Sequence, residues 1–287
     1  MMKKKINIAV IFGGRSGEHE VSLMSARNVL SVLDPAKYEV TQIGITLNGQ
    51  WLTGEDVLGK FESGRTKELE PVIVAPDPSL RGVYVLRNSN YVKLSEVDVY
   101  FPVLHGTFGE DGTIQGLFEM ADAAYVGAGV AGSSVGMDKG IFKDVMHTHN
   151  IPSVESITVL RSEIEKDINA VIERAEKVSG YPIFTKPANL GSSVGVTKCH
   201  SRSDLQEGLM DASLYDRRVM IEQGVANARE IEVSVLGNDE PRASVPGEVL
   251  PSREFYSYES KYIDGTSGLV IPAPLPQATT ARIQPPR

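Results

Sequence analysis

Cysteine and tryptophan are nearly absent from the sequence, each occurring once. A single thiol, Cys199, cannot form an internal disulfide, so a reducing, cytoplasmic location is expected. Apolar runs are also short, and none approaches the roughly 20 residues that span a bilayer. Residues 6–12 are apolar but contain Asn7, and they lead into Gly13-Gly14 rather than a cleavage site, which favours a strand over a signal peptide.

Basic residues are outnumbered, with 29 Lys+Arg against 37 Asp+Glu and a formal net charge of -8. Because nucleic-acid binding depends on basic patches that displace counterions, this balance argues against a nucleic-acid partner. It leaves room for a local basic pocket that holds a small polyanion. The 287 residues, 41% of them hydrophobic, are typical of a globular protein with about two domains.

Hydrophobic patterning predicts an α/β architecture. A helical pattern occupies residues 114–121, and a short strand is expected at residues 123–126. The pair Asn48-Gly49 predicts a hairpin turn. Because strands and helices alternate, we expect a parallel sheet with covering helices. Three earlier apolar runs are interpreted as strands: residues 6–12, 38–46 and 97–104.

A second unit of helices and strands begins near Ser134, and strands predominate from Val219 onward. One long helix is expected to end at Gly180. The proline-rich residues 272–287 are interpreted as an interrupted connection. Two residue pairs predict capped helix starts: Ser162 with Glu165, and Ser203 with Gln206.

Two glycine-rich segments match nucleotide-binding patterns incompletely. Residues 54–60 fit most of a Walker A loop, but Phe61 stands where a Ser or Thr should hold magnesium. Residues 127–132 fit the dinucleotide fingerprint, but no acidic residue ends a following strand about 20 positions later. We interpret the second segment as a hinge between lobes, and a dinucleotide-dependent oxidoreductase remains a distant alternative.

The sequence around Lys186 combines a charge with a small-residue loop. Lys186 ends a predicted strand, and the amides and hydroxyls of residues 187–195 can surround phosphate oxygens. A mobile hairpin with an incidental lysine is the alternative. Lys139 follows a run of small residues near a predicted helix start, and the alternative for it is a solvated surface lysine. Residues 222–225 are either a hinge beneath an adenine or a polar turn, and Glu230 can be an exposed strand-end acid.

Two polar turns that contain glycine follow strands of the first unit. One spans residues 13–23 and includes Glu18, and the other spans residues 105–112. Ligands bind at the carboxyl ends of parallel strands, so both turns are candidates for a substrate site. The helix dipole also favours an acid at a helix N-terminus, which explains Glu18 without any ligand.

Five motifs in this order resemble the D-alanine–D-alanine ligases of the ATP-grasp superfamily, over the chain up to about residue 284. They are Gly13-Gly14-x-Ser16-x-Glu18-x-Glu20-Val21-Ser22, His105-Gly106-x-x-Gly109-Glu110-Asp111-Gly112, Met137-Asp138-Lys139, Lys186-Pro187 with Gly191-Ser192-Ser193-x-Gly195, and residues 255–262. The resemblance implies a Rossmann-like, parallel-sheet substrate lobe over residues 1–133. An ATP-grasp fold is then expected, with a central lobe over residues 134–218 and an incomplete C-terminal lobe over residues 219–287.

The resemblance implies an ATP-dependent condensation of two D-alanines, through an acyl phosphate, for peptidoglycan synthesis. A carboxylate is a poor electrophile, so the protein must position the reactants and neutralise phosphate charge. Related D-lactate-adding ligases lack the pair Lys261-Tyr262, which favours an amine nucleophile here. The alternatives are another ATP-grasp acid–amine ligase and a non-catalytic remnant that binds D-alanine or dimerises. A homodimer through the N-terminal lobe is expected, and no membrane partner.

The same resemblance implies roles for individual residues. Glu18 holds the ammonium group of the first D-alanine and forms a hydrogen-bonded trio with Ser192 and Tyr262. His105 and Ser22 belong to the same substrate site. The phosphates of ATP are bound by lysines, of which Lys261 reaches the transferred one; Glu222 and Val225 contact adenine, and Glu230 binds the ribose. The complete expected ATP site is Lys139, Lys186, Ser193, Glu222, Val225, Glu230 and Lys261.

One departure from the family concerns the end of the chain. Family members continue past residues like Ile283, with an arginine for the tetrahedral intermediate and Asp, Glu and Asn ligands for two Mg²⁺ (or Mn²⁺) ions. No such metal ligand is therefore expected in this chain. Because phosphoryl transfer requires charge neutralisation, we expect a truncated member that is inactive as it stands. Apolar surface is expected to be exposed near residues 231–236.

Overall fold

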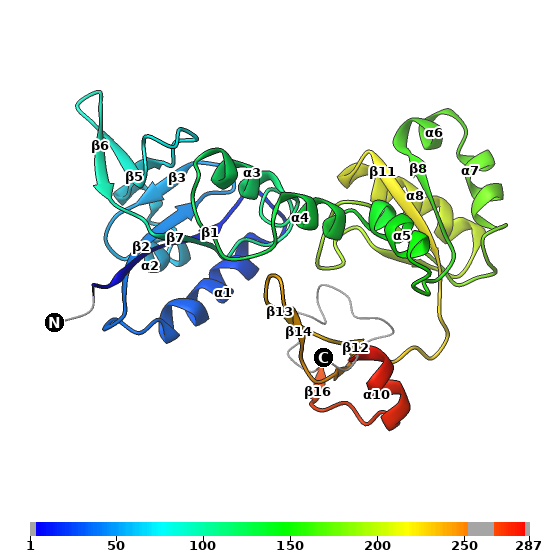
Figure 1. Ribbon diagram of the computed structural model, residues 1–287. Helices are drawn as coiled ribbons and strands as arrows, with labels where there is room; N and C mark the ends of the chain where they lie inside the picture. The colour runs from blue at the N-terminus through cyan, green and yellow to red at the C-terminus, as the bar shows by residue number, and fades with distance from the viewer. Residues whose placement is uncertain (1–3, 252–266, 285–287) are drawn as a thin grey trace.

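The computed structural model describes residues 4–251 and 267–284 and has three groups of elements, each built on its own main sheet (Figure 1). The first group has seven strands in the order β6-β5-β4-β3-β2-β1-β7. The strands are β1 (Ile6–Gly13), β2 (Tyr38–Ile45), β3 (Trp51–Thr53), β4 (Glu70–Ile73), β5 (Val83–Arg87), β6 (Asn90–Ser95) and β7 (Val99–Pro102). The helices are α1 (His19–Val32), α2 (Val57–Glu62), the 3-10 helix η1 (Thr66–Glu68) and α3 (Thr113–Met120).

Only part of this sheet is parallel. Strand β1 is parallel to β2 and β7, as the alternation of strands and helices predicts. From β2 to β6 each strand is antiparallel to the next, so the expectation of a parallel sheet is wrong there. The cause is the predicted hairpin turn, in which Gly49 N donates to Thr46 O at 2.8 Å and brings β3 back alongside β2.

Strand β1 is buried on both faces and lies between β2 and β7 in the first sheet. Ala9 and Ile11 face one apolar cluster, whereas Ile8, Val10 and Phe12 face another, as the two-residue repeat of a strand requires. Helix α3 covers the first cluster, and α1 and α2 cover the second (Figure 1). Because β1 and β7 are parallel, the turns that follow them leave from the same end of the sheet.

The second group is a four-stranded antiparallel sheet in the order β10-β9-β11-β8. Its strands are β8 (Ser156–Leu160), β9 (Ile183–Pro187), β10 (Thr197–Cys199) and β11 (Arg218–Gln223), and its helices are α6 (Arg161–Lys166), α7 (Ile168–Ala175) and α8 (Arg202–Tyr215). Two further helices, α4 (Val130–Met137) and α5 (Lys139–Thr148), connect it to the first group (Figure 1).

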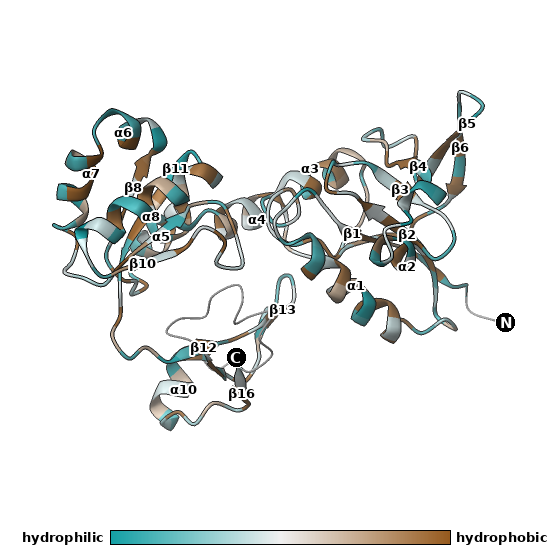
Figure 2. Ribbon diagram, turned by 180° about the vertical axis from the view of Figure 1, so that it is seen from behind, coloured by the Kyte–Doolittle hydropathy of each residue, from teal (hydrophilic) through white to brown (hydrophobic). Residues whose placement is uncertain are grey.

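The two faces of this sheet differ in character. One face carries Ile183, Val219 and Ile221, which form an apolar cluster with residues of α7 and α8. Helices α6 and α7 accordingly show both hydrophobic and hydrophilic bands in Figure 2. The register pairs Phe184 with Glu222, and the alternation of side chains puts Lys186 on the same face. Charged groups therefore share the second face, which α5 approaches.

Three details of the predicted helices are wrong. The long helix is two helices, because Asp167 ends α6 and its carboxylate accepts from Ala170 N at 3.0 Å to begin α7. Helix α6 begins before Ser162, and Glu163 rather than Glu165 reaches back to Leu160 N, at 2.8 Å.

At α8 the cap is Ser201, whose hydroxyl accepts from Asp204 N at 3.2 Å, rather than Ser203 with Gln206. The strand expected at residues 123–126 is an isolated bridge between Tyr100 and Tyr125. The cap of α8 is therefore a serine, as predicted, but it lies two residues earlier in the chain. The predicted strand pairs with β7 at one position only.

The third group consists of β12 (Glu230–Glu232), β13 (Val235–Leu236), β14 (Arg242–Ala243), β15 (Gly247–Leu250), β16 (Gly268–Val270) and α10 (Gln277–Ile283). The sheet order is β12-β15-β16, with β13 and β14 paired separately. Helix α10 occupies part of the proline-rich segment that was expected to be a connection. Val235 and Leu236 are 67% and 83% exposed, as expected for this region.

The first lobe boundary expected from the sequence, at residues 133–134, falls inside α4 (Val130–Met137). The lobe boundaries themselves remain a prediction. In the part of the chain that the structure describes, no helix is long and apolar enough to cross a membrane.

Candidate functional site

The turns after β1 and β7 are joined to each other. Gly13 and Gly14 have φ values of +86° and +104°, which glycine adopts without strain, and they turn the chain sharply at the sheet edge. Ser16 Oγ donates to His105 O at 2.7 Å and accepts from Glu18 N at 3.1 Å. This hydroxyl fixes Glu18 against the second turn.

Glu18 carries a buried carboxylate, and only one of its two oxygens has a hydrogen-bond partner among the described residues. Glu18 is only 3% exposed, and its Oε1 accepts a hydrogen bond from the hydroxyl of Ser192, in the loop between β9 and β10. Oε2 has no hydrogen-bond partner among the described residues. An unpartnered buried carboxylate oxygen is costly, so this atom is suited to a cationic ligand.

Two glycines make room for this carboxylate. A Cβ added to Gly106 lies 2.3 Å from Glu18 Oε2, and one added to Gly191 lies 2.7 Å from it. These two glycines come from different groups of elements, and both loops approach the same oxygen. The close approach explains why both positions lack a side chain.

His105 and Ser22 lie near Glu18 but in different surroundings. His105 is half-buried, shares a hydrogen bond of 2.9 Å between Nε2 and Ser25 Oγ, and lines a small cavity of about 220 Å³. Ser22 is fully buried, accepts from Gly13 N at 2.8 Å and donates to Val103 O. Its hydroxyl therefore links the end of β1 to the residue that follows β7, and Ser22 does not line the cavity.

Acidic and basic groups converge on the charged face of the second sheet. Glu222 receives ion pairs from Lys186 and from Lys143, the latter at 2.5 Å. Burial alone raises the pKa of Glu222, but the charge of Lys186 and hydrogen bonds from Lys143 and Lys186 outweigh it, so the pKa lies below its usual value. The carboxylate is ionised at neutral pH.

Lys139 is presented from the first turn of α5. Asp138 caps this helix by accepting from Gly140 N and Ile141 N, each at 3.0 Å, and it pairs with Arg218 of β11 at 2.5 Å. Lys139 N donates to Ala188 O at 2.9 Å. The start of α5 is thus bonded to β11 and to the loop that follows Lys186.

The ammonium group of Lys139 donates to Leu190 O. Burial lowers the pKa of Lys139 to about 8, and the nearby charge of Lys186 adds to this effect. Asp138, Glu222 and Glu18 oppose it electrostatically. The pKa of Lys139 therefore depends on charges both in the turn that carries Glu18 and on the second sheet.

A cleft of about 940 Å³ contains the positions expected to bind ATP, other than Lys261. It lies between the charged face of the second sheet and the third group. Its lining includes Lys139, Lys186, Ser192, Ser193, Glu222, Val225 and Glu230. The structure thus brings together residues that are dispersed over about 90 positions of sequence. Volume and charge both suit a nucleotide polyphosphate.

Lys261 and Tyr262 lie outside the described residues. Within residues 4–251 and 267–284, no three His, Cys, Asp or Glu side chains are grouped in a way that could hold a metal ion. The described residues therefore do not fit the magnesium or manganese expected from the family resemblance.

Sequence reasoning missed Lys143, Phe184 and Lys198. The ring of Phe184 lies 5.3 Å from Lys186 Nζ and 5.9 Å from Lys198 Nζ, in the cleft lining. The alternation of residues in β9 could have placed Phe184 on the same face as Lys186. The spacing of four residues between Lys139 and Lys143 could have placed both on one face of a helix.

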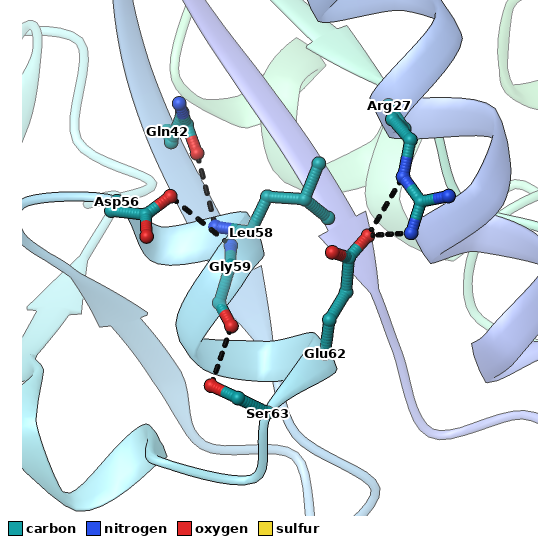
Figure 3. A network of polar contacts seen from close by, with 7 residues as sticks. All are labelled: Arg27, Gln42, Asp56, Leu58, Gly59, Glu62 and Ser63. Carbon is teal, nitrogen blue, oxygen red and sulfur yellow. Dashed lines mark hydrogen bonds and ion pairs between the residues drawn. The ribbon is translucent and has the colours of Figure 1, made fainter.

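The rejected Walker A segment is an ordinary capped helix. Asp56 accepts from Gly59 N at 3.3 Å, and Gln42 Oε1 accepts from Leu58 N at 3.1 Å (Figure 3). Side chains of the protein therefore occupy amide groups that a phosphate-binding loop would offer to its ligand. Residues 127–132 lead into α4, between the first and second groups, where a hinge was expected.

Comparison with known proteins agrees with this arrangement. The family model described as "D-ala D-ala ligase N-terminus" matches residues 7–128, and that described as "D-ala D-ala ligase C-terminus" matches residues 145–285. The chain belongs to the D-alanine–D-alanine ligase family. A relative from Natranaerobius thermophilus, named D-alanine--D-alanine ligase, is 47% identical over 282 residues, which are 98% of this chain and 76% of that protein.

Solved structures of family members have the same fold. The VanG D-Ala:D-Ser ligase from Enterococcus faecalis matches with a TM-score of 0.82 and 34% identity, covering 98% of this chain and 80% of that chain. The D-alanine-D-alanine ligase from Coxiella burnetii matches with a TM-score of 0.81 and 32% identity, over 98% and 74% of the two chains. The ATP-grasp architecture expected from the sequence is therefore correct.

Proposed function

We propose that this chain joins two D-alanines in a reaction driven by ATP, and so supplies D-alanyl-D-alanine for cell wall synthesis in the cytoplasm. The observation that carries the proposal is the carboxylate of Glu18, which is buried with Oε2 unpartnered among the described residues. It hydrogen-bonds to Ser192, in the lining of a cleft that contains Lys139 and Lys186. An anionic group for an amino acid thus adjoins a cationic cleft for a polyphosphate.

In this function Glu18 accepts a hydrogen bond from the ammonium group of the first D-alanine. Charge-assisted hydrogen bonds of this kind are the strong ones, and burial strengthens them further. Ser192 holds the other carboxylate oxygen, and Tyr262 completes the trio. His105 lines the subsite, whereas Ser22 positions the turn from behind, since its hydroxyl already bonds to Gly13 and Val103.

The phosphates of ATP are bound by Lys139, Lys186 and Ser193, and Lys261 contacts the phosphoryl group that is transferred. Glu222 and the backbone of Val225 contact adenine, and Glu230 binds the ribose hydroxyls. ATP supplies the phosphoryl group that makes the first carboxylate an acyl phosphate, which the amine of the second D-alanine attacks with release of phosphate. No step is assigned to a metal ion, because the described residues offer no site for one.

The ligation is tested by measuring phosphate release from ATP with the purified 287-residue chain, magnesium and D-alanine. We propose that the chain is active, against the expectation of inactivity drawn from the missing metal ligands, so we expect release that depends on D-alanine and formation of the dipeptide in equal amount. Binding of both substrates without turnover would contradict ligation and would favour the alternative of a remnant that only binds. Release that depends equally on other amino acids would favour a different acid–amine ligase.

The role of Glu18 is tested with the variants Glu18→Gln and Glu20→Gln. Glu18→Gln removes the charge that faces the ammonium group, so the affinity for D-alanine should fall about ten- to hundredfold in calorimetry. Glu20 is exposed in the same first turn of α1, so Glu20→Gln is a matched control that should change it less than about twofold. Equal effects of the two variants would contradict the assignment.

A further inference from the structure

Lys143 lies behind the cleft rather than in its lining. It follows Lys139 by one turn of α5, and only 16% of its side chain is exposed. Its ammonium group lies 2.5 Å from Glu222 Oε1 and donates to Val154 O at 2.8 Å. Val154 precedes the start of β8, and Glu222 is near the end of β11. Lys143 therefore bonds α5 to two parts of the second sheet.

Glu222 has a different lysine on each oxygen. Oε2 pairs with Lys186, which lines the cleft, and Oε1 pairs with Lys143, which does not. A polyphosphate in the cleft competes with Glu222 for Lys186. If Lys186 turns to the phosphates, Lys143 is the counter-charge that stays, and it spares Glu222 the cost of an unpaired buried charge.

We infer that Lys143 is a positioning residue for base recognition: it holds the Glu222 carboxylate so that this group accepts a hydrogen bond from the exocyclic amine of adenine. The inference rests on the proposed function, in which Glu222 contacts adenine. A carboxylate only accepts hydrogen bonds, and the 6-amino group of adenine donates them. The 6-oxo group of hypoxanthine, the base of ITP, or of guanine also only accepts hydrogen bonds, so a fixed carboxylate at this place repels those bases.

The measured quantity is base selectivity, the dissociation constant of ITP divided by that of ATP, from calorimetric titration of the full chain. ITP differs from ATP in carrying the 6-oxo group, so any effect on phosphate binding common to both nucleotides cancels in the ratio. We expect Lys143→Met to lower the ratio about fivefold or more. Lys143→Arg keeps a positive charge and should retain the ratio within about twofold.

A matched control is Lys166→Met, which also removes one positive charge from the second group. Lys166 is exposed in α6 and forms no ion pair among the described residues, so the ratio should stay unchanged. Circular dichroism and thermal unfolding of each variant show whether it is folded. A folded Lys143→Met variant whose ratio equals that of the unsubstituted chain overturns the inference, because an electrostatic effect on phosphates alone leaves the ratio constant.

Glu222→Gln shows whether Lys143 acts through the carboxylate. We expect this variant to lower the ratio, and the double variant with Lys143→Met to have the same ratio as Glu222→Gln alone. A further loss in the double variant overturns the inference, since Lys143 would then act independently of Glu222. Failure of the unsubstituted chain to bind either nucleotide overturns the proposed ATP site itself, and is distinguished by the absence of any titration signal.

Discussion

At the scale of single residues, the most informative group is Lys139. Its ammonium group is buried beside Lys186, and burial with this neighbouring charge lowers its pKa to about 8. A lysine with an ordinary pKa near 10.5 would stay charged throughout the physiological range. The protein thus keeps a cation that loses its proton easily at the place where phosphate is expected.

This pKa predicts a pH dependence of ATP binding. Below pH 8 Lys139 is charged and attracts the triphosphate, and above pH 8 it becomes neutral, so the affinity for ATP should fall as pH rises from 7.5 to 9.5. The decrease is at most about tenfold per pH unit. Lys139→Arg stays charged over this range, so its calorimetric profile should be much flatter. An unsubstituted chain that binds ATP equally well at pH 7.5 and 9.5 contradicts the prediction.

The place of a residue in the site could be predicted from the sequence where that residue belongs to a family motif. Glu18, Lys139 and Lys186 lie in motifs that resemble a family, and the structure brings them to adjoining positions. Lys143 was not predicted, because its role depends on an ion pair with Glu222, 79 positions away, and no local pattern encodes that contact. The side-chain positions of Lys261 and Tyr262 lie outside the described residues, so their roles remain predictions.

At the scale of elements, helix α2 shows how a nucleotide-binding pattern can arise from a cap. Asp56 has a φ of 49° and satisfies Gly59 N, while Gln42 of β2 satisfies Leu58 N (Figure 3). Lys60, in the place of the Walker A lysine, is 3.7 Å from Glu68. Each of these residues has a local structural role that requires no phosphate.

We therefore predict that Asp56→Ala destabilises the protein without weakening ATP binding. Loss of a helix cap costs about 0.5–2 kcal/mol of the free energy of unfolding, measured in urea. The dissociation constant for ATP should stay within about twofold, as it should for Lys60→Met. A large loss of ATP affinity in the folded Lys60→Met variant would show that residues 54–60 bind the nucleotide after all.

A second element-scale prediction concerns the packing of α2 on the first sheet. A Cβ added to Gly44 of β2 lies 2.3 Å from the ring of Phe61, which also packs edge-on against Phe12. Gly44→Ala should therefore cost about 1–3 kcal/mol of unfolding free energy through overpacking.

The control for this prediction is Gly116→Ala in α3. No atom lies within 4 Å of the added Cβ, and alanine is the better helix former, so stability should rise by up to about 1 kcal/mol. Urea unfolding that shows the same sign for both variants would contradict the described packing of Phe61.

Element types were easier to predict than element boundaries. Strand β1 was predicted within one residue, because its apolar run is continuous and ends at Gly13-Gly14. The division between α6 and α7 was missed, because the apolar positions Ile164, Val171 and Ile172 keep a helical spacing across the break. Only the side chain of Asp167, which caps the second helix, reveals the interruption.

At the scale of the whole molecule, the site is made where separate groups of elements meet. The hydrogen bond between Ser192 and Glu18 joins residues 174 positions apart, and the cleft is lined by the second and third groups together. Local patterns predict each sheet but not how sheets are arranged. The convergence was therefore expected only through the resemblance to a family, and the structure supports it with contacts that the motifs do not specify.

The most direct measurement is a crystal structure of this chain with D-alanine and a non-hydrolysable ATP analogue. We predict that the ammonium group of D-alanine lies within hydrogen-bond distance of Glu18 Oε2, the oxygen without a partner among the described residues. The triphosphate should lie against Lys139 and Lys186. D-Alanine bound away from Glu18, or a triphosphate that contacts neither lysine, would contradict the account.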